Sequence, residues 1–198
     1  MILNHMLQLL GIVAMEPPVS SDALAIRNEM PKVFQSLRKM TKEEVSDYVL
    51  RGQYISSTVR GKIQPAYREE KGVDPESKTE TYVALKCFID NWRWSGVPFF
   101  IRTGKCLPTR VTEVVIHFRP NPHKIFSQKN GLDNVGNKLS IRIQPDEGLV
   151  LKFGMKVPGT GFQVDHVSMD FHYSSLNEKH IPDAYERLLS DCMIGEAT

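Results

Sequence analysis

The chain from residue 81 to residue 173 is a succession of strand-like segments separated by turn-forming residues, and this pattern restricts the fold more than any other feature. Several segments alternate apolar and polar side chains, which is typical of strands with one buried face. In order, they are TYVALKCFID, VPFFIRTG, RVTEVVIHF, NKLSIRIQ, GLVLKFGMKV and HVSMDFHY. The sequence Pro145-Asp146-Glu147-Gly148, between the fourth and fifth segments, favours a hairpin bend. We therefore expect a mostly antiparallel sheet.

Helices are predicted on both sides of the strand region. Residues 1–15 contain no proline, and their helix must end before the Pro-Pro pair that follows, because proline cannot continue a helix. A second helix is predicted to begin at Ser21 or Asp22, both good N-cap residues, and to extend to Lys39. A third, amphipathic helix is predicted over residues 184–194. Helices that flank hairpin-connected strands indicate an α+β fold.

The segments between the second helix and the strands contain fewer sequence signals of regular secondary structure. Residues 41–54 are predicted to pass from a polar turn into a strand. Residues 55–79 contain few apolar side chains and two prolines, which predicts a long, irregular surface loop. The complete prediction is an α+β fold with a large, mostly antiparallel β-sheet and helices packed on one face.

Composition excludes several classes of function. The formal net charge is +2, without long charged runs, which argues against binding to nucleic acid or to a membrane surface. The three cysteines, Cys87, Cys106 and Cys192, are far apart and odd in number, so we expect a reducing, cytoplasmic compartment. The GTG sequence at residues 159–161 precedes no predicted helix and lacks the third glycine of a dinucleotide loop. HVSMDFHY matches no metal-ligand spacing, so no metal site is expected.

One polar face interrupts the apolar N-terminal helix. At about 100° per residue, Asn4, His5 and Gln8 fall on one side of a helix that we otherwise expect to be buried nearly all round. Buried polar groups must be paired or must face a cavity. Two interpretations of His5 stay open from the residues alone, namely a hydrogen-bonded core histidine and a group in a functional cavity.

A group of cations surrounds a predicted tight bend in the segment IRTGKCLPTR. Arg102, Lys105 and Arg110 lie within nine residues of one another, around Gly104 and Pro108. Closely spaced cations on a fixed turn suit a phosphate monoester. The segment does not have the spacing of a P-loop, so phosphate binding is one hypothesis and a solvated basic turn is the other.

Several segments, taken together and in order, resemble the C-terminal part of the glucose-6-phosphate dehydrogenase family. The resemblance covers essentially all 198 residues. The segments are NHMLQLLGIVAMEPP, RGQY, YREEKGVDPESKTETYVALKCFIDNWRWSGVPFFIRTGKCLPTRVTEV, IRIQPDEG, KVPG and DAYERLLSD.

The resemblance implies an activity and roles for particular residues. The family oxidises glucose 6-phosphate at C1 to 6-phosphoglucono-1,5-lactone with hydride transfer to NADP⁺, the first step of the oxidative pentose phosphate pathway. His5 matches the family's general base. Lys105 and Arg110 match contacts to the sugar phosphate, and Gln144 matches a further substrate contact.

The resemblance also implies where the cofactor binds. In the family, NADP⁺ is held mainly by an N-terminal dinucleotide-binding domain, which the resemblance does not cover. Some members bind a second, structural NADP⁺. Val111 and Val150 occupy the positions of its lysine and tyrosine here, whereas Arg102 and Arg142 are retained as candidate contacts.

We therefore expect residues 1–198 to form one C-terminal substrate and dimerisation domain, truncated at both ends and inactive alone. The resemblance implies a homodimer, or a higher oligomer, through the sheet. The alternative function is a non-catalytic oligomerisation or sugar-phosphate-binding module derived from that domain.

Overall fold

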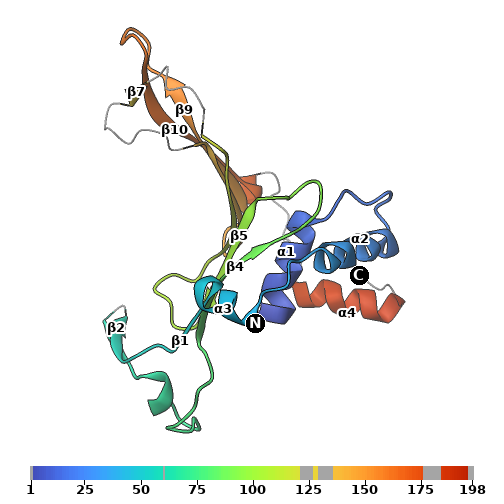
Figure 1. The fold of residues 1–198 in the computed structure, drawn as a ribbon, viewed down its shortest axis with the longest axis vertical. Coiled ribbons are helices and arrows are strands. Elements are labelled where there is room, and N and C mark those ends of the chain that lie inside the picture. The colour runs from blue at the N-terminus through green and yellow to red at the C-terminus, as the bar shows by residue number, and fades with distance from the viewer. Residues whose placement is uncertain (1, 60, 121–126, 129–135, 176–183, 196–198) are drawn as a thin grey trace. The chain divides into compact units, whose positions relative to one another are not determined.

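The structure, a computed structural model, describes residues 2–59, 61–120, 127–128, 136–175 and 184–195 (Figure 1). The chain divides into two compact units. The first unit comprises Met1–Pro108 and Asp183–Thr198, and the second comprises Thr109–Pro182.

The first unit begins with helices. A π-helical segment, η1 (Ile2–Met6), continues into α1 (Leu7–Ala14), which ends before the Pro-Pro pair as predicted. α2 (Ala23–Gln35) starts as predicted, because the Asp22 carboxylate accepts a hydrogen bond from the Ala25 N–H at 2.8 Å. α4 (Ala184–Ile194) has the predicted bounds.

α2 ends four residues earlier than predicted, and the reason is tertiary. After Ser36 the backbone turns to the sheet, where Leu37 forms a β-bridge with Ile89 and the Arg38 N–H donates to the Phe88 carbonyl at 2.9 Å. A residue whose backbone groups are hydrogen-bonded to a strand cannot also make the backbone hydrogen bonds of a helix. The Arg38 guanidinium then binds the Asp90 carboxylate, at 2.9 and 2.6 Å, which fixes this connection.

Two segments contain more regular structure than predicted. Residues predicted as a polar turn form α3 (Lys42–Tyr48), because Thr41 and Glu44 make a capping box that satisfies the first backbone N–H groups. The predicted irregular loop contains three short elements, which are β2 (Ser57–Val59), β3 (Lys62–Gln64) and the 3-10 helix η2 (Tyr67–Glu69).

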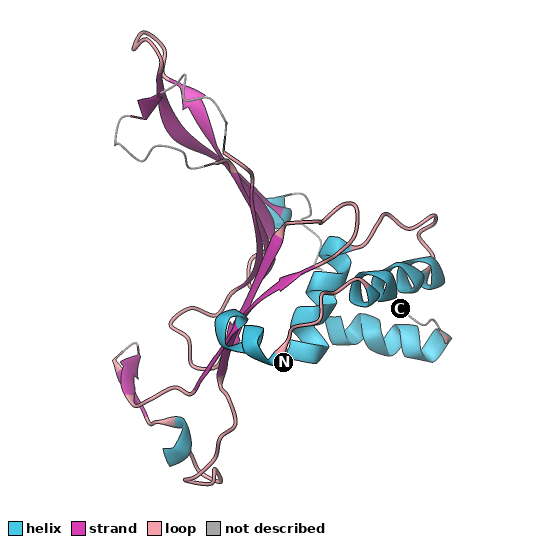
Figure 2. Cartoon of the chain, viewed as in Figure 1, coloured by secondary structure: helices cyan, strands magenta, loops and turns pink. Residues whose placement is uncertain are grey.

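The fold class is α+β with mostly antiparallel strands, as predicted (Figure 2). The strands form separate hydrogen-bonded sheets rather than the single sheet expected. In the first unit, β1 (Val49–Gly52), β4 (Tyr82–Phe88) and β5 (Pro98–Gly104) form an antiparallel sheet in the order β1-β4-β5. β2 and β3 pair in a two-stranded sheet.

In the second unit, the described residues form five strands in the order β6-β8-β9-β10-β7. Four of them pair antiparallel, and the predicted hairpin joins β8 to β9. The short β7 pairs with β10 in parallel. Their bounds are β6 (Thr112–His117), β7 (Ser127–Gln128), β8 (Lys138–Gln144), β9 (Gly148–Lys156) and β10 (Gln163–His172).

The core of the first unit lies between the sheet and the helices α1 and α2. Its buried members are Leu10, Ala14, Val33, Cys87 and Ile89. Burial raises the pKa of the Cys87 thiol to about 11, because the charged thiolate loses its hydration there.

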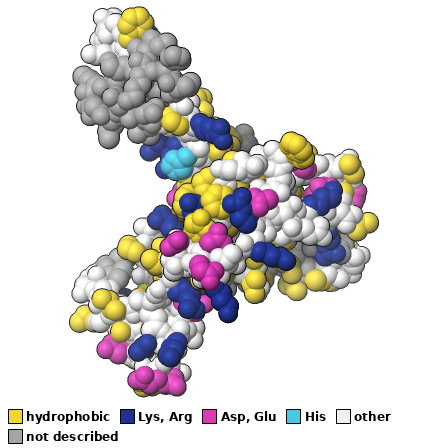
Figure 3. All heavy atoms as spheres, in the orientation of Figure 1, with side chains coloured by type: hydrophobic (Ala, Val, Ile, Leu, Met, Phe, Trp, Pro, Cys, Tyr) yellow, Lys and Arg dark blue, Asp and Glu magenta, His cyan; other side chains and the backbone are white. Residues whose placement is uncertain are grey.

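Apolar side chains also remain on the outside of this unit (Figure 3). Leu50 and Phe100 lie on the sheet with 60% and 74% of their surface exposed. Among the described residues, no helix has the length and apolar character needed to span a bilayer.

The positions of two isoleucines of the first unit predict that their substitutions differ greatly in their effect on the free energy of unfolding. Ile89 is 0% exposed and Ile63, on β3, is 82% exposed. We expect Ile89→Ala to lower the free energy of unfolding by about 2–5 kcal/mol, because it leaves a cavity. Ile63→Ala, the matched control, should change it by less than about 0.5 kcal/mol. Urea unfolding of the three proteins measures both values, and equal effects would contradict this description of the core.

Candidate functional site

His5 lies on the surface of η1. Its side chain is exposed, as are those of Asn4 and Gln8, so the interpretation as a hydrogen-bonded core histidine is wrong. The expectation of a helix buried nearly all round is also wrong, since Leu3 is 75% exposed and Ile12 is 53% exposed. η1 contacts β5, the strand that ends one residue before Lys105. The structure therefore brings the segment of His5 next to the strand that leads to Lys105.

The predicted tight bend after β5 is confirmed, and close packing explains its glycine. A Cβ atom on Gly104 would lie 2.9 Å from Cδ2 of the Tyr82 ring and 3.3 Å from Cγ of Leu107. The Lys105 N–H donates to the Thr81 carbonyl at 2.8 Å, which ties the turn to the start of β4. Cys106 follows with φ of 54°, in the left-handed region. Non-glycine residues rarely adopt this conformation, which costs roughly 1–2 kcal/mol.

A polar network beside this turn was not predicted from the sequence. The Tyr54 hydroxyl donates to the Glu70 carboxylate at 3.3 Å, and the Gln64 amide donates to the same oxygen at 2.7 Å. Desolvation, together with hydrogen bonding to Cys106, raises the pKa of Tyr54 to about 12. The network joins Tyr54 to Gln64 and Glu70 of the predicted irregular loop. Its one signal in the sequence is that Tyr54 is the last residue of the RGQY segment.

Arg102 lies in β5, before the bend. It is exposed and alternates with Phe99 and Ile101, which pack against the core. Its side chain is therefore on the face of the sheet opposite to α1 and α2.

The other predicted substrate contacts belong to the second unit. Gln144 ends β8, and its register partner is Thr112, the first residue of β6. Arg110 precedes Thr112 by two residues, and the side chains of Arg110 and Gln144 are both exposed. The structure therefore brings Arg110 and Gln144 to the same end of two neighbouring strands.

Arg142 sits in a cluster of charged side chains on the same sheet. Its guanidinium donates to Asp170 at 2.6 Å and lies 3.9 Å from Asp146. The His172 ring lies 2.9 Å from the Asp146 carboxylate and 3.2 Å from the Asp170 carboxylate. A Cβ atom on Gly148 would overlap the Phe171 carbonyl oxygen and would lie 2.7 Å from the Arg142 guanidinium, so glycine is needed where the side chain crosses β9. Two carboxylates therefore balance the charge of Arg142. Sequence reasoning missed the pairing with Asp170 because that residue lies on β10, which is separated from β8 by β9.

The described residues do not form a dinucleotide-binding fold. Such a fold requires parallel strands joined by helical crossovers, whereas the described strands pair antiparallel except for β7 with β10. Within the described ranges, no group of three or more histidine, cysteine or acidic side chains is placed to hold a metal ion.

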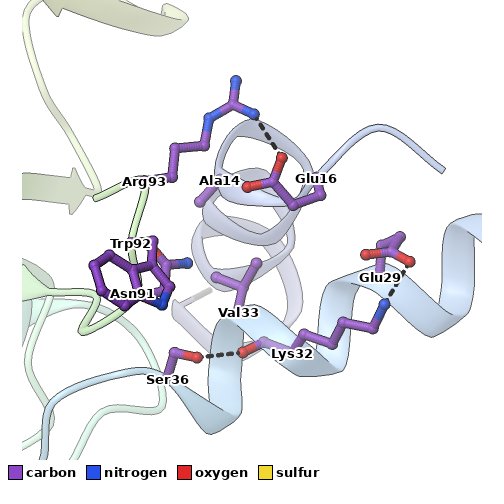
Figure 4. A pocket seen from close by; sticks show the side chains of 9 residues that line it. All are labelled: Ala14, Glu16, Glu29, Lys32, Val33, Ser36, Asn91, Trp92 and Arg93. Atoms are coloured by element: carbon purple, nitrogen blue, oxygen red, sulfur yellow. Dashed lines mark hydrogen bonds and ion pairs between the residues drawn. The ribbon is translucent and has the colours of Figure 1, made fainter. Parts of the chain in front are cut away.

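A pocket of about 210 Å³ lies beside α1 and α2, away from the predicted site residues (Figure 4). Two ion pairs border it, Arg93 with Glu16 at 2.8 Å and Lys32 with Glu29 at 2.6 Å. Because its cations are paired, this pocket offers no excess positive charge to a phosphate. It is lined by Ala14, Glu16, Glu29, Lys32, Val33, Ser36, Asn91, Trp92 and Arg93.

Comparisons with known proteins identify the family. The model for the C-terminal domain of glucose-6-phosphate dehydrogenase matches residues 1–198. Glucose-6-phosphate 1-dehydrogenase of Aggregatibacter actinomycetemcomitans is 54% identical over 195 residues, and the enzyme of Treponema pallidum is 53% identical over 199 residues. The chain belongs to the glucose-6-phosphate dehydrogenase family.

The match covers 98% and 100% of this chain but only 39% of the length of either relative. Solved structures of the family agree with the fold. A glucose-6-phosphate dehydrogenase in complex with its substrate glucose-6-phosphate superposes with a TM-score of 0.82 at 36% identity, over 98% of this chain and 38% of that one. The enzyme of Mycobacterium avium gives 0.76 at 35% identity, over 99% of this chain and 38% of that one.

The space around two glycines predicts that their substitution by alanine has opposite effects on stability. Gly104→Ala should lower the free energy of unfolding by about 1–3 kcal/mol, because the new methyl group overlaps the Tyr82 ring. Gly52, in β1, has open space where a Cβ would stand. Gly52→Ala, the control, should leave stability unchanged or raise it by about 0.4–1 kcal/mol. Thermal and urea unfolding compare the two variants, and a stable Gly104→Ala protein would contradict the close approach.

Proposed function

We propose that this chain is the substrate-binding and dimerisation part of an NADP-dependent glucose-6-phosphate dehydrogenase. The complete enzyme would oxidise glucose 6-phosphate to 6-phosphoglucono-1,5-lactone. The observation that carries the proposal is the contact of η1 with β5, since it brings the segment of His5 beside the strand that leads to Lys105. The family match over all 198 residues supports the same assignment.

His5 is proposed as the general base. It would take the proton of the C1 hydroxyl as the hydride leaves C1, so that the C1 carbonyl of the lactone forms. The exposure of its ring on η1 supports this role, because a base must be accessible to substrate. NADP⁺, which accepts hydride in this chemistry, would be bound by a part of the enzyme outside the residues described here.

Lys105, Arg110 and Gln144 are proposed as contacts to the sugar phosphate. A phosphate monoester carries close to two negative charges, so cations on a fixed bend offset the loss of its hydration. Lys105 and Arg110 are exposed and would supply that charge, and the Gln144 amide would hydrogen-bond to the substrate. Arg102 and Arg142 would be remnants of a second, structural NADP⁺ site, whose lysine and tyrosine positions hold Val111 and Val150 in this chain. The aspartate partners of Arg142 would then have to share its guanidinium with the nucleotide.

Dimerisation through the sheet and a cytoplasmic location belong to the same proposal. Exposed Leu50 and Phe100 on the sheet of the first unit are apolar surface that a partner would cover. The three cysteines are free thiols, as expected in a reducing compartment.

The direct test adds to this chain the part of a relative that the chain does not match. A fusion would join the unmatched part of the Aggregatibacter actinomycetemcomitans relative to this chain. We expect the fusion to produce NADPH from glucose 6-phosphate and NADP⁺, measured by absorbance, and the chain alone to give no rate above the blank. A soluble, folded fusion without activity would favour the alternative of a non-catalytic sugar-phosphate-binding or oligomerisation module. Activity of the chain alone would contradict the proposed division of roles.

The role of His5 predicts a large effect on turnover in that fusion. His5→Ala should reduce kcat by about 10²–10⁴-fold with little change in KM for glucose 6-phosphate, because a general base acts mainly in the transition state. His117→Ala is the matched control, since His117 is an exposed histidine of β6 outside the proposed site. Near-normal turnover of His5→Ala would remove His5 from the mechanism.

A further inference from the structure

Gln144 is followed directly by the bend that joins β8 to β9, and this bend is bound to the end of β10. The Tyr173 N–H, just after β10, donates to the Glu147 carbonyl of the bend at 3.0 Å. His172, the last residue of β10, places Nδ1 of its ring 2.9 Å from the Asp146 carboxylate of the bend. One backbone contact and one side-chain contact thus hold the bend that begins next to Gln144.

Four ionisable side chains form a closed cycle of contacts at this place. Asp146 and Asp170 each lie between the His172 imidazole and the Arg142 guanidinium. The imidazole is 2.9 Å from Asp146 and 3.2 Å from Asp170, through its two nitrogens. The guanidinium is 3.9 Å from Asp146 and 2.6 Å from Asp170. The closer side-chain partner of the bend is therefore His172.

The cycle is complete only when both ring nitrogens of His172 carry a proton. A carboxylate oxygen accepts hydrogen bonds and cannot donate them, so each nitrogen must be a donor to bind its aspartate. A neutral imidazole has one donor nitrogen, and its other nitrogen would face a carboxylate with a lone pair. In the protonated ring, the contact to Asp146 is charge-assisted and Asp170 holds the ring in its orientation.

The charged groups at and next to the His172 ring come from four elements. The Arg142 guanidinium, whose Nη2 lies 3.4 Å from both ring nitrogens, opposes a positive charge on the ring, whereas the carboxylates favour it. β9 adds no charge at this point, since its residue in register with Arg142 and His172 is Gly148. The groups are Arg142 of β8, Asp146 and Glu147 of the bend, Asp170 of β10, and Glu113 of β6, which is the register partner of Arg142.

We propose that His172 is a positioning residue whose protonated ring fixes the bend after Gln144, and thereby the Gln144 amide, for contact with the substrate. The inference rests on the proposed function, in which Gln144 binds glucose 6-phosphate. His172 acts through Asp146 and has no contact with substrate in this role. Because the cycle is complete only with a charged ring, binding of glucose 6-phosphate gains strength as pH falls through the titration of His172.

The first test measures kinetics of the active fusion. His172→Gln should raise KM for glucose 6-phosphate by about two- to tenfold at about pH 6 while kcat changes much less, because a hydrogen bond that positions a substrate contact is lost. At about pH 8.5 an ordinary histidine is neutral in the wild type as well, so the ratio of the two KM values should fall towards one. The ratio is taken at one pH, so the titration of the substrate phosphate affects both proteins alike.

His117→Gln is the matched control for this titration. His117 is an exposed histidine at the end of β6 remote from Thr112, the register partner of Gln144. Its KM should equal that of the wild type at every pH. A KM ratio for His172→Gln that does not change with pH would overturn the proposal, and so would a loss of kcat at unchanged KM.

A double-mutant cycle separates positioning through Asp146 from a general loss of stability. In an Asp146→Ala background, His172→Gln should have little further effect on KM, because the contact between the two side chains is already absent. Additive effects of the two substitutions would show that His172 does not act through the bend, and the proposal would fail.

The second test uses the 198-residue chain alone and needs no activity. The side-chain amide resonances of Gln144, measured by NMR, should move between about pH 5 and pH 8 in the wild type and in His117→Gln, and much less in His172→Gln. Equal movement in His172→Gln overturns the inference, whatever the kinetics. An inactive wild-type fusion combined with a His172-dependent movement at Gln144 would refute the proposed function while the structural role of His172 stands.

Discussion

The packing of α1 against β4 is the interaction on which the first unit depends. Ala14 of α1 and Ile89, just after β4, are almost completely buried, and the Trp94 indole donates to the Ala14 carbonyl at 2.9 Å. Burial of the Ile89 side chain contributes about 1.5–3 kcal/mol. Gly11 lets Met30 and Phe34 of α2 approach α1 closely. Since η1 continues into α1 and β5 pairs with β4, this core also sets the positions of His5 and Lys105.

Two glycines lie where other side chains approach the backbone closely. At Gly104, directly before Lys105, the Tyr82 ring occupies the volume that a Cβ atom would need. At Gly148 the guanidinium of Arg142 crosses β9 and reaches Asp170 on β10. Both contacts join different strands, so each bend or crossing is stable only when the sheet is complete.

The residues assigned to substrate divide between the two compact units. His5 and Lys105 belong to the first, and Arg110 and Gln144 lie at one end of the sheet of the second. The chain spans 39% of the length of either of these relatives.

The sequence by itself determined the elements whose signals are local. The Pro-Pro pair ended α1, the Asp22 cap began α2, and the Pro145-Gly148 bend placed the β8–β9 hairpin. Its motifs also identified the family. Tertiary structure decided the rest, because the deciding contacts join distant residues. Ile89 ends α2 early by pairing with Leu37, and Thr81 ties Tyr54 to Lys105 across 24 residues or more of chain. The exposure of His5 is likewise tertiary, since the periodicity of a helix defines its faces but not which of them a neighbouring element covers.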